Sequence, residues 1–303
     1  MSTVRPADAG RLALAAACWG IGTVISKAAL VDVPPVTLLA TQLAVSVVVL
    51  VGLMRASGIP LRGEAPALLG RLGLLNPGLA YALSLLGLTT ISASASVLLW
   101  TLEPLMILVL AGLLLGERIT PLIVALSLTA AVGIGVAVYD PTGASSAVVG
   151  IGLTVVGIAC CAAYTVATRK FLPGARETSQ VVLAQQLYGL LLALVLVSAV
   201  ALAGVSVAPA KITLPGVAAA VVSGALYYAG AYWLYLGALR RVPASIAAST
   251  FYLIPIVGVT FGAVLLGDRL GPTQWIGALT VVGAVIGILT RHSTAPLPEP
   301  TSA

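Results

Sequence analysis

One acidic residue stands deep inside an apolar stretch of the sequence. Glu103, followed by Pro104, lies near the middle of the stretch 92–115. An ionised carboxylate at the centre of a membrane-spanning helix costs about 2.5–3.5 kcal/mol. The sequence places no basic residue at comparable depth, so Glu103 either stays protonated or meets a cation that comes and goes. A proton or an ammonium group would serve as that cation; the alternative is a protonated, hydrogen-bonded structural residue.

Aromatic side chains offer a second kind of chemistry. Tyr228, Tyr232 and Tyr235 follow an i, i+4, i+7 spacing and therefore share one face of a helix. Such rings stack on apolar or aromatic groups, or hold an ammonium by cation–π attraction. The alternative is an aromatic belt at the membrane interface or plain packing. We expect the belt for Tyr235, whereas Trp19 and Tyr164 fit both interpretations.

The composition indicates that these residues lie in a chain surrounded by lipid. Of the 303 residues, 60% are hydrophobic and only 8% are charged, where a soluble domain carries about a quarter. The three cysteines stand in apolar runs, and the single histidine, His292, stands in the polar tail. We therefore expect no metal, no cofactor and no redox site.

Windows of about 20 apolar residues, the length that crosses a bilayer, predict ten transmembrane helices. Turn-forming residues such as Pro34-Pro35 and Gly271-Pro272 separate these windows. The predicted helices are 11–30, 36–54, 67–88, 92–115, 121–139, 147–168, 180–204, 215–238, 244–266 and 273–290.

The basic residues predict the orientation in the membrane. With the N-terminus in the cytoplasm, the outer side receives only Lys211 and Arg269, and Lys27 lies near the outer end of the first helix, where it is expected to reach the outer headgroups. The net charge of +6 is explained by this bias rather than by nucleic-acid binding. We expect a multi-pass protein of the inner (plasma) membrane with both termini cytoplasmic. The inner side receives Arg5, Arg11, Arg55, Arg62, Arg71, Arg118, Arg169, Lys170, Arg176, Arg240, Arg241 and Arg291.

An internal repeat is the most specific feature of the sequence. Residues 100–104 and 113–121 recur 151 positions later as 251–255 and 264–272, with their prolines and a Gly-acid-Arg corner in register. Tyr81 falls on Tyr232 at the same offset, and Lys27 on Lys170 at an offset of 143. Because five helices per half is an odd number, the second half enters the membrane from the opposite side. Such inverted repeats are typical of transporters whose substrate site lies at the repeat interface.

The doubled corner resembles a known family. Residues 115–118 (Leu-Gly-Glu-Arg) and 266–269 (Leu-Gly-Asp-Arg), each with a mid-helix proline before and another proline after, resemble the EamA type of the drug/metabolite transporter superfamily, as does Trp19-Gly20. The resemblance covers residues 11–290. It implies a ten-helix inverted-repeat fold and export of small metabolites, commonly amino acids, by alternating access. Within that superfamily, the chain resembles the aromatic-amino-acid exporters.

These observations predict an all-α membrane protein in two five-helix repeats. Its expected parts are a cytoplasmic N-terminus (1–10), a first repeat (11–139), an outer loop (140–146), a second repeat (147–290) and a disordered cytoplasmic tail (291–303). The predicted substrate-binding residues are Trp19, Tyr81, Trp100, Glu103, Tyr164, Tyr228, Tyr232 and Phe251, and the predicted hinges are Gly87, Pro104, Gly237 and Pro255.

Three functional classes compete, and a transporter explains most. An enzyme would need a cluster of histidines or paired carboxylates, and a channel would need a continuous polar lining along a pore. A carrier of phosphates would need midspan lysine or arginine. We therefore expect an exporter of neutral or aromatic amino acids, with the bilayer and protons as further partners and no nucleic acid. Another uncharged or cationic metabolite or drug is the alternative substrate.

Overall fold

The structure is a computed structural model that describes residues 5–61, 67–115, 121–138, 145–171, 177–239, 251 and 253–292. These residues form helices and contain no strand. The predictions for the corner 116–118, for residues 140–144 of the predicted outer loop and for the tail from 293 onward lie outside them.

Each predicted span contains helical segments, several of which are interrupted. The first half holds α1 (Pro6–Ala29), α2 (Pro35–Ala56), α3 (Ala67–Arg71), η1 (Leu72–Leu74), η2 (Leu75–Leu79), α4 (Ala80–Leu88), α5 (Ala93–Leu99), α6 (Leu102–Leu115) and α7 (Pro121–Val138). The second half holds α8 (Ser145–Phe171), α9 (Thr178–Leu202), α10 (Leu214–Ser223), η4 (Gly224–Gly230), α11 (Ala231–Leu239), α13 (Leu253–Phe261), η6 (Gly262–Leu266) and α14 (Pro272–His292). The segments η2, η4 and η6 are π-helical turns.

Five helices in the described residues are long and apolar enough to cross a membrane. They are Pro6–Ala29, Pro35–Ala56, Ala147–Thr168, Thr178–Leu202 and Leu214–Tyr235. Shorter apolar helices, Ala93–Ile107 and Leu253–Leu266, accompany them. The chain is therefore an all-helical protein with several apolar spans. Its end helices are longer than predicted, since α1 begins at Pro6 and α14 continues to His292.

Local sequence signals set several helix ends. Pro35, Pro121 and Pro272 are the first residues of α2, α7 and α14, where the missing proline N–H would have had no helical partner. Ser92 caps α5 by accepting a hydrogen bond from Ala95 N at 3.0 Å, and Thr213 caps α10 in the same way. These caps satisfy amide groups that lipid could not.

Pro104 interrupts the span that was predicted as one helix from 92 to 115. Proline cannot donate to the carbonyl four residues before it, which belongs to Trp100. That carbonyl accepts from Glu103 N at 3.1 Å instead, and a turn at Trp100–Thr101 separates α5 from α6. The break lies beside both the predicted acid and a predicted aromatic contact.

The internal repeat of the sequence recurs in the helix boundaries. The start of α4 at Ala80 and the start of α11 at Ala231 lie 151 positions apart, as do the starts of α6 and α13 and those of α7 and α14. The starts of α2 and α9 lie 143 positions apart. The π-helical turns η2 and η4 directly precede α4 and α11. Sequence repeats and structural repeats therefore coincide.

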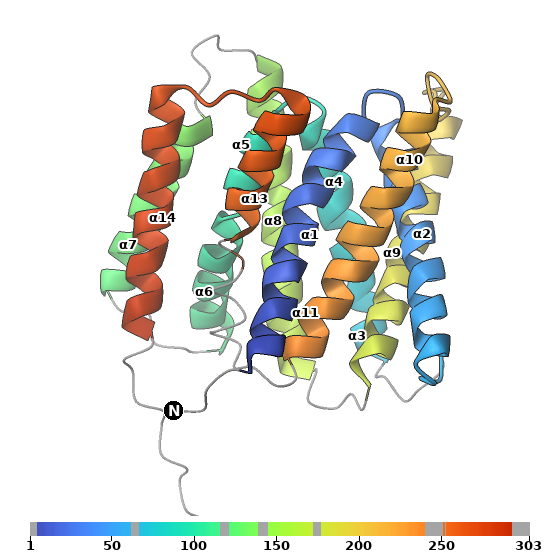
Figure 1. Cartoon of the computed structure of the whole chain (residues 1–303), viewed down its shortest axis with the longest axis horizontal. Helices are drawn as coiled ribbons and strands as arrows, with labels where there is room; N and C mark the ends of the chain where they lie inside the picture. Colours follow the sequence, from blue (N-terminus) through green and yellow to red (C-terminus); the bar gives the residue numbers. More distant parts are fainter. Residues whose placement is uncertain are drawn as a thin grey trace, which may run out of the picture.

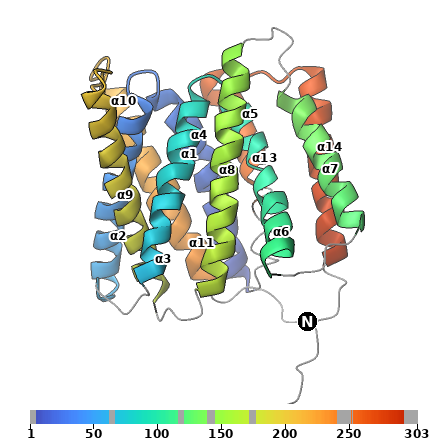
Figure 2. The same ribbon diagram turned by 180° about the vertical axis from the view of Figure 1, so that it is seen from behind.

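The packing between helices also follows the repeat, because corresponding helices of each half pack on the first helix of the other half. Helix α4 packs on α8 as α11 packs on α1, and α6 packs on α8 as α13 packs on α1. The mates α2 and α9 pack on each other, and so do α7 and α14, which stand as a peripheral pair (Figure 1). Helix α1 runs from the lower to the upper face of the molecule whereas α8 runs downward (Figure 2). The halves thus run in opposite directions.

The outer surface of the bundle is apolar. Large hydrophobic side chains are widely exposed, among them Leu113 (75%), Val48 (71%) and Val264 (75%). A soluble monomer rarely presents contiguous apolar surface of this kind. Lipid is the medium in which such a surface is stable.

Glycines bring α4 and α8 into close contact. A Cβ atom built on Gly87 would overlap Thr154 Oγ1 and stand 2.5 Å from Gly150 O. A Cβ atom built on Gly157 would likewise stand 2.6 Å from Ala80 O and from Ser84 Oγ. Without hydrophobic driving force between helices in lipid, such close approach provides much of the packing energy. Gly87, predicted as a hinge, stands at this point of contact.

We expect Gly87→Ala to lower the stability of the folded protein by about 1–3 kcal/mol, because the added methyl overpacks the α4–α8 contact. Thermal unfolding in detergent, followed by intrinsic fluorescence, measures the effect. Gly152→Ala is the matched control on α8, since a Cβ there meets nothing within 4 Å. Equal melting temperatures for both variants would contradict the packing role.

Candidate functional site

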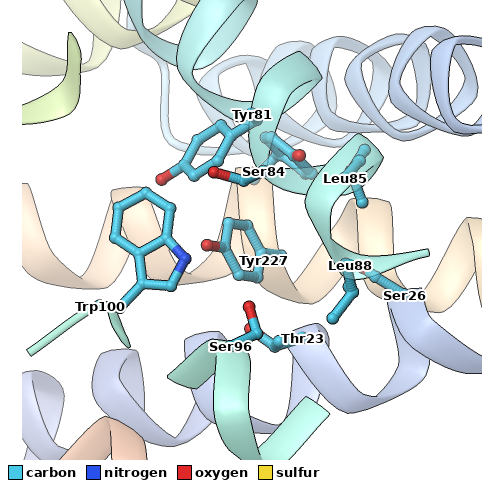
Figure 3. A pocket seen from close by; sticks show the side chains of 10 residues that line it. Thr23, Ser26, Tyr81, Ser84, Leu85, Leu88, Ser96, Trp100 and Tyr227 are labelled. Carbon is cyan, nitrogen blue, oxygen red and sulfur yellow. The ribbon is translucent and has the colours of Figure 1, made fainter. Parts of the chain in front are cut away.

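A small cavity lies between the two halves near the centre of the bundle. Residues of α1, α4, α5 and η4 line it: Thr23, Ser26, Tyr81, Ser84, Leu85, Leu88, Ser96, Trp100, Tyr227 and Tyr228. Its volume is about 20 Å³, which is room for about one water molecule. Figure 3 shows the ring of Trp100 at one end of the cavity and Leu85 and Leu88 at the other.

Four aromatic residues, four serine or threonine residues and two leucines line the cavity, so that hydroxyl groups are set in a mainly apolar wall. Thr23 Oγ1 donates to Trp19 O at 3.0 Å and Ser84 Oγ to Ala80 O at 2.9 Å. Because both hydroxyl protons are donated within their own helices, the two oxygens can act only as acceptors toward other groups. Ser26 Oγ accepts from Gln42 Nε2 at 2.8 Å, so its own proton is free to be donated. The hydroxyls thus offer both acceptors and a donor.

Two repeat mates meet directly beside the cavity. The hydroxyls of Tyr81 and Tyr232 lie 2.9 Å apart, and Asn76 Nδ2 donates to the Tyr232 hydroxyl at 3.3 Å. All three side chains are buried. The ring of Tyr81 also contacts the rings of Trp100 and Tyr227, with centroids 5.6 and 5.2 Å apart. This aromatic layer separates the cavity from the half of the bundle below it.

A second aromatic cluster forms the lower side of this layer. Trp19 contacts Tyr232, Tyr235 and Phe251, with ring centroids 5.5–5.6 Å apart and edge-to-face geometry. Tyr235 contacts Phe251 at 5.1 Å. Tyr235, which was expected in an interfacial belt, is half-buried and packs against Trp19 and Phe251. The cluster links α1 to α11 and to Phe251.

Glu103 lies outside the set of residues that line the cavity. Its Oε1 accepts a hydrogen bond from Cys161 Sγ at 3.2 Å, which joins α6 to α8. The ion pair between Arg11 and Asp8 is the one recorded in the described residues, and it does not involve Glu103. A thiol is a weak hydrogen-bond donor, so this contact adds little stabilisation to a negative charge on Glu103.

The other predicted residues lie around this centre. Tyr164 donates to Gln185 Oε1 at 2.8 Å and is buried between α8 and α9, so it serves a contact between helices. Pro104 and Pro255 stand in the first turns of α6 and α13. A Cβ atom built on Gly237, a predicted hinge, would meet nothing within 4 Å, so this position is not in a close helix contact.

The structure adds cavity residues that the sequence did not single out. Thr23, Ser26, Ser84 and Ser96 line the cavity, and their place there depends on which helices meet. Tyr227 stands off the predicted face of Tyr228 and Tyr232. The π-helical turn η4 widens the helix, so that Tyr227 and Tyr228 both contact Tyr81 at 5.2 Å. The tyrosine pair in the sequence was the signal available.

Comparisons with known proteins agree with a transporter fold. The profile of the EamA-like transporter family matches residues 11–139 and 148–290. The permease-like protein YdzE of Bacillus subtilis (strain 168) is 32% identical over 66 residues, which cover 22% of this chain and 85% of that protein. A solved crystal structure of another protein resembles this chain with a TM-score of 0.67 at 20% identity, covering 94% of this chain and 98% of the other. That last likeness concerns the fold alone.

We expect Tyr232→Phe to destabilise the protein more than Tyr81→Phe does. Loss of the Tyr232 hydroxyl leaves both Asn76 Nδ2 and the Tyr81 hydroxyl without this partner, which lowers the free energy of unfolding by about 1–3 kcal/mol. Tyr81→Phe, in contrast, leaves Tyr232 bonded to Asn76. Thermal unfolding of both single variants and the double variant measures the coupling. Additive effects of the two substitutions would contradict the contact.

Proposed function

This chain belongs to the EamA-like transporter family, and from that premise we propose that it exports neutral, above all aromatic, amino acids across the inner (plasma) membrane by alternating access. An uncharged or cationic metabolite or drug of similar shape is the alternative substrate. The protein binds and releases its substrate without changing it chemically.

The observation that carries this proposal is the two-sided lining of the cavity. The rings of Tyr81, Trp100 and Tyr227 suit an aromatic side chain, and hydroxyl acceptors such as Thr23 and Ser84 suit an ammonium group. No lysine or arginine is among the lining residues in the described part of the chain. A substrate with a net negative charge would lack a counter-ion there, which favours a zwitterionic or uncharged molecule.

The size of the cavity supports transport through alternating states. Sites for small molecules measure about 300–1,000 Å³, far more than this cavity of about 20 Å³. An amino acid can therefore bind at this cavity only after the helices that line it move apart. Inverted repeats supply such a motion, because each half can adopt the arrangement of the other.

The proposed topology has ten spans with both termini in the cytoplasm. The start of α1 and the end of α14 lie at the same lower face (Figure 1), and α1 and α8 run in opposite directions. Basic residues favour the cytoplasmic side, and Arg5, Arg11, Arg55 and Arg71 flank helix ends at this face. The two repeats, 11–139 and 147–290, then exchange their orientation in the membrane, with the outer loop 140–146 between them.

We assign Glu103 to the proton rather than to the substrate. Its carboxylate bonds to Cys161 and stands apart from the lining of the cavity, yet it follows the break at Trp100 by three residues. Movement of α5 relative to α6 during transport would therefore change the surroundings of the carboxylate. Coupling between proton binding and cavity opening follows from that arrangement.

Trp100→Ala is expected to weaken transport of phenylalanine, because it removes a ring from the cavity wall. By analogy with base–aromatic stacking, the loss is about 1–3 kcal/mol, or roughly 5- to 150-fold. Uptake of labelled phenylalanine into proteoliposomes measures it, with labelled glutamate as the substrate that should not be carried. Trp275→Ala on the peripheral α14, where the ring is 51% exposed, is the matched control. Wild-type phenylalanine transport by Trp100→Ala would count against this cavity as the substrate site.

Glu103→Gln should fold and insert normally, because the amide keeps the shape of the side chain and removes a buried charge. Transport should fall, or lose its dependence on pH, since the amide binds no proton over the range tested. Proteoliposome transport measured between about pH 5 and pH 8 tests this. The chain has a single histidine, His292, at the end of α14 and far along the chain from Glu103. Wild-type transport at every pH would leave Glu103 a structural residue.

A further inference from the structure

Three helices that line the cavity end together at the upper face of the molecule. Ser26 in α1, Leu88 in α4 and Ser96 in α5 are lining residues close to those ends. The loop between η6 and α14 crosses the same face (Figure 1). Contacts among these four segments therefore decide whether the cavity opens upward.

Lys27 joins α1 to the end of α4. Its Nζ donates to Leu88 O at 2.7 Å and lies 3.4 Å from Thr89 O. Carbonyls in the last turn of a helix lack partners in that helix and carry the negative end of its dipole. Lys27 was expected to reach the outer headgroups; in the structure its half-buried side chain bonds to these carbonyls at the end of α4. The residue before it, Ser26, already lines the cavity.

Asp268 joins the second half to the start of α5. Its Oδ2 accepts from Ser94 N at 3.0 Å and from Ser94 Oγ at 2.9 Å. Ser94 is 1% exposed and Asp268 is half-buried, so this contact is partly shielded from water. A Cβ on Gly262 would stand 2.8 Å from Ser94 Oγ and 3.1 Å from Asp268 Oδ2, so the contact needs a glycine beside it. Two residues below Ser94, Ser96 lines the cavity.

The two contacts support each other through charge. Asp268 acts electrostatically on the Lys27 ammonium, although the described residues record no direct ion pair between them. Opposite charges in a partly buried site are screened less than at a free surface. Each group is held in place by its own hydrogen bonds, and the attraction between the two charges adds to them.

We propose that Lys27, Ser94 and Asp268 form the outer gate of the transporter, closed in this arrangement and broken when the cavity opens to the outside. The proposal rests on the proposed function for its purpose, since a gate needs a transported substrate. Asp268 of the second repeat bonds to Ser94 of the first repeat, and Lys27 of α1 bonds to the end of α4. Parting the two halves at the upper face must break the hydrogen bonds of Asp268.

The residue types of the gate recur in the sequence at the repeat offsets. Lys27 corresponds to Lys170, Ser94 to Ser245 and Asp268 to Glu117. The side chains of these three mates lie outside the described part of the chain, so the correspondence concerns sequence alone. It indicates that the trio belongs to the repeat unit rather than to one loop.

Accessibility of the cavity tests the gate. The reporter is Ser96→Cys in the full-length chain, reconstituted in vesicles and treated from the upper face with a membrane-impermeant thiol reagent. Mass spectrometry reads the modification at position 96, so that the three native cysteines do not interfere. Lys27→Met and Asp268→Ala should each raise the labelling rate about tenfold, because each removes hydrogen bonds of a charged group. Asp268→Asn should give a smaller rise, because its amide oxygen still accepts from Ser94.

Lys211→Met is the matched control, since it removes an exposed lysine in the loop between α9 and α10 and should leave labelling at the parent rate. Unchanged labelling in both Lys27→Met and Asp268→Ala, with each variant eluting as folded protein, would overturn the gate. So would an equal rise in Lys211→Met. If labelling responds as expected while the wild type carries no amino acid, the gate stands and the proposed substrate fails.

Discussion

The contact between the hydroxyls of Tyr81 and Tyr232 sets the geometry at the centre of this protein. Two residues related by a repeat can touch each other only beside the axis that relates the halves, and these oxygens lie 2.9 Å apart. The aromatic rings, the cavity and the break at Trp100 are arranged around that point. Asn76 bonds to the same pair from the π-helical turn η2, so three polar groups share one buried site.

Lipid changes what can hold such a bundle together. Apolar side chains gain little by leaving hydrocarbon for a protein interior, so close packing and hydrogen bonds between helices must stabilise the fold. Glycines supply the close packing, as Gly87 and Gly150 do between α4 and α8. Side-chain hydrogen bonds supply the rest, and Gln42, which donates to Ser26 and Ser223, joins three helices in this way. The bundle is consequently rigid where glycines meet and adjustable where polar groups can exchange partners.

Three layers then follow one another from the upper to the lower face. The contacts of Lys27 and Asp268 close the upper end, the hydroxyl-lined cavity lies beneath them, and the aromatic layer around Tyr81 and Trp19 closes the cavity from below. Glu103 and Cys161 lie outside the cavity lining. A carrier needs two barriers that open in turn, and the polar barrier above and the aromatic barrier below respond to different forces. Hydrogen bonds to charged groups break when water enters, whereas stacked rings part when a ligand ring replaces one of them.

The sequence alone determined the class of this protein, the approximate places of its apolar segments and its repeat, because lipid requires long apolar segments and a repeat leaves its prolines and glycines in register. The pairing of Tyr81 with Tyr232 followed from the same offset. Only the tertiary structure decided which polar groups meet. The partner of Glu103 is a cysteine 58 positions away, Lys27 bonds to carbonyls of α4, and four small hydroxyl residues become a cavity wall. Periodicity in the sequence determines which residues share a face of one helix, but η2, η4 and the break at Trp100 shift that face. The partner of a side chain depends further on how two separate helices cross.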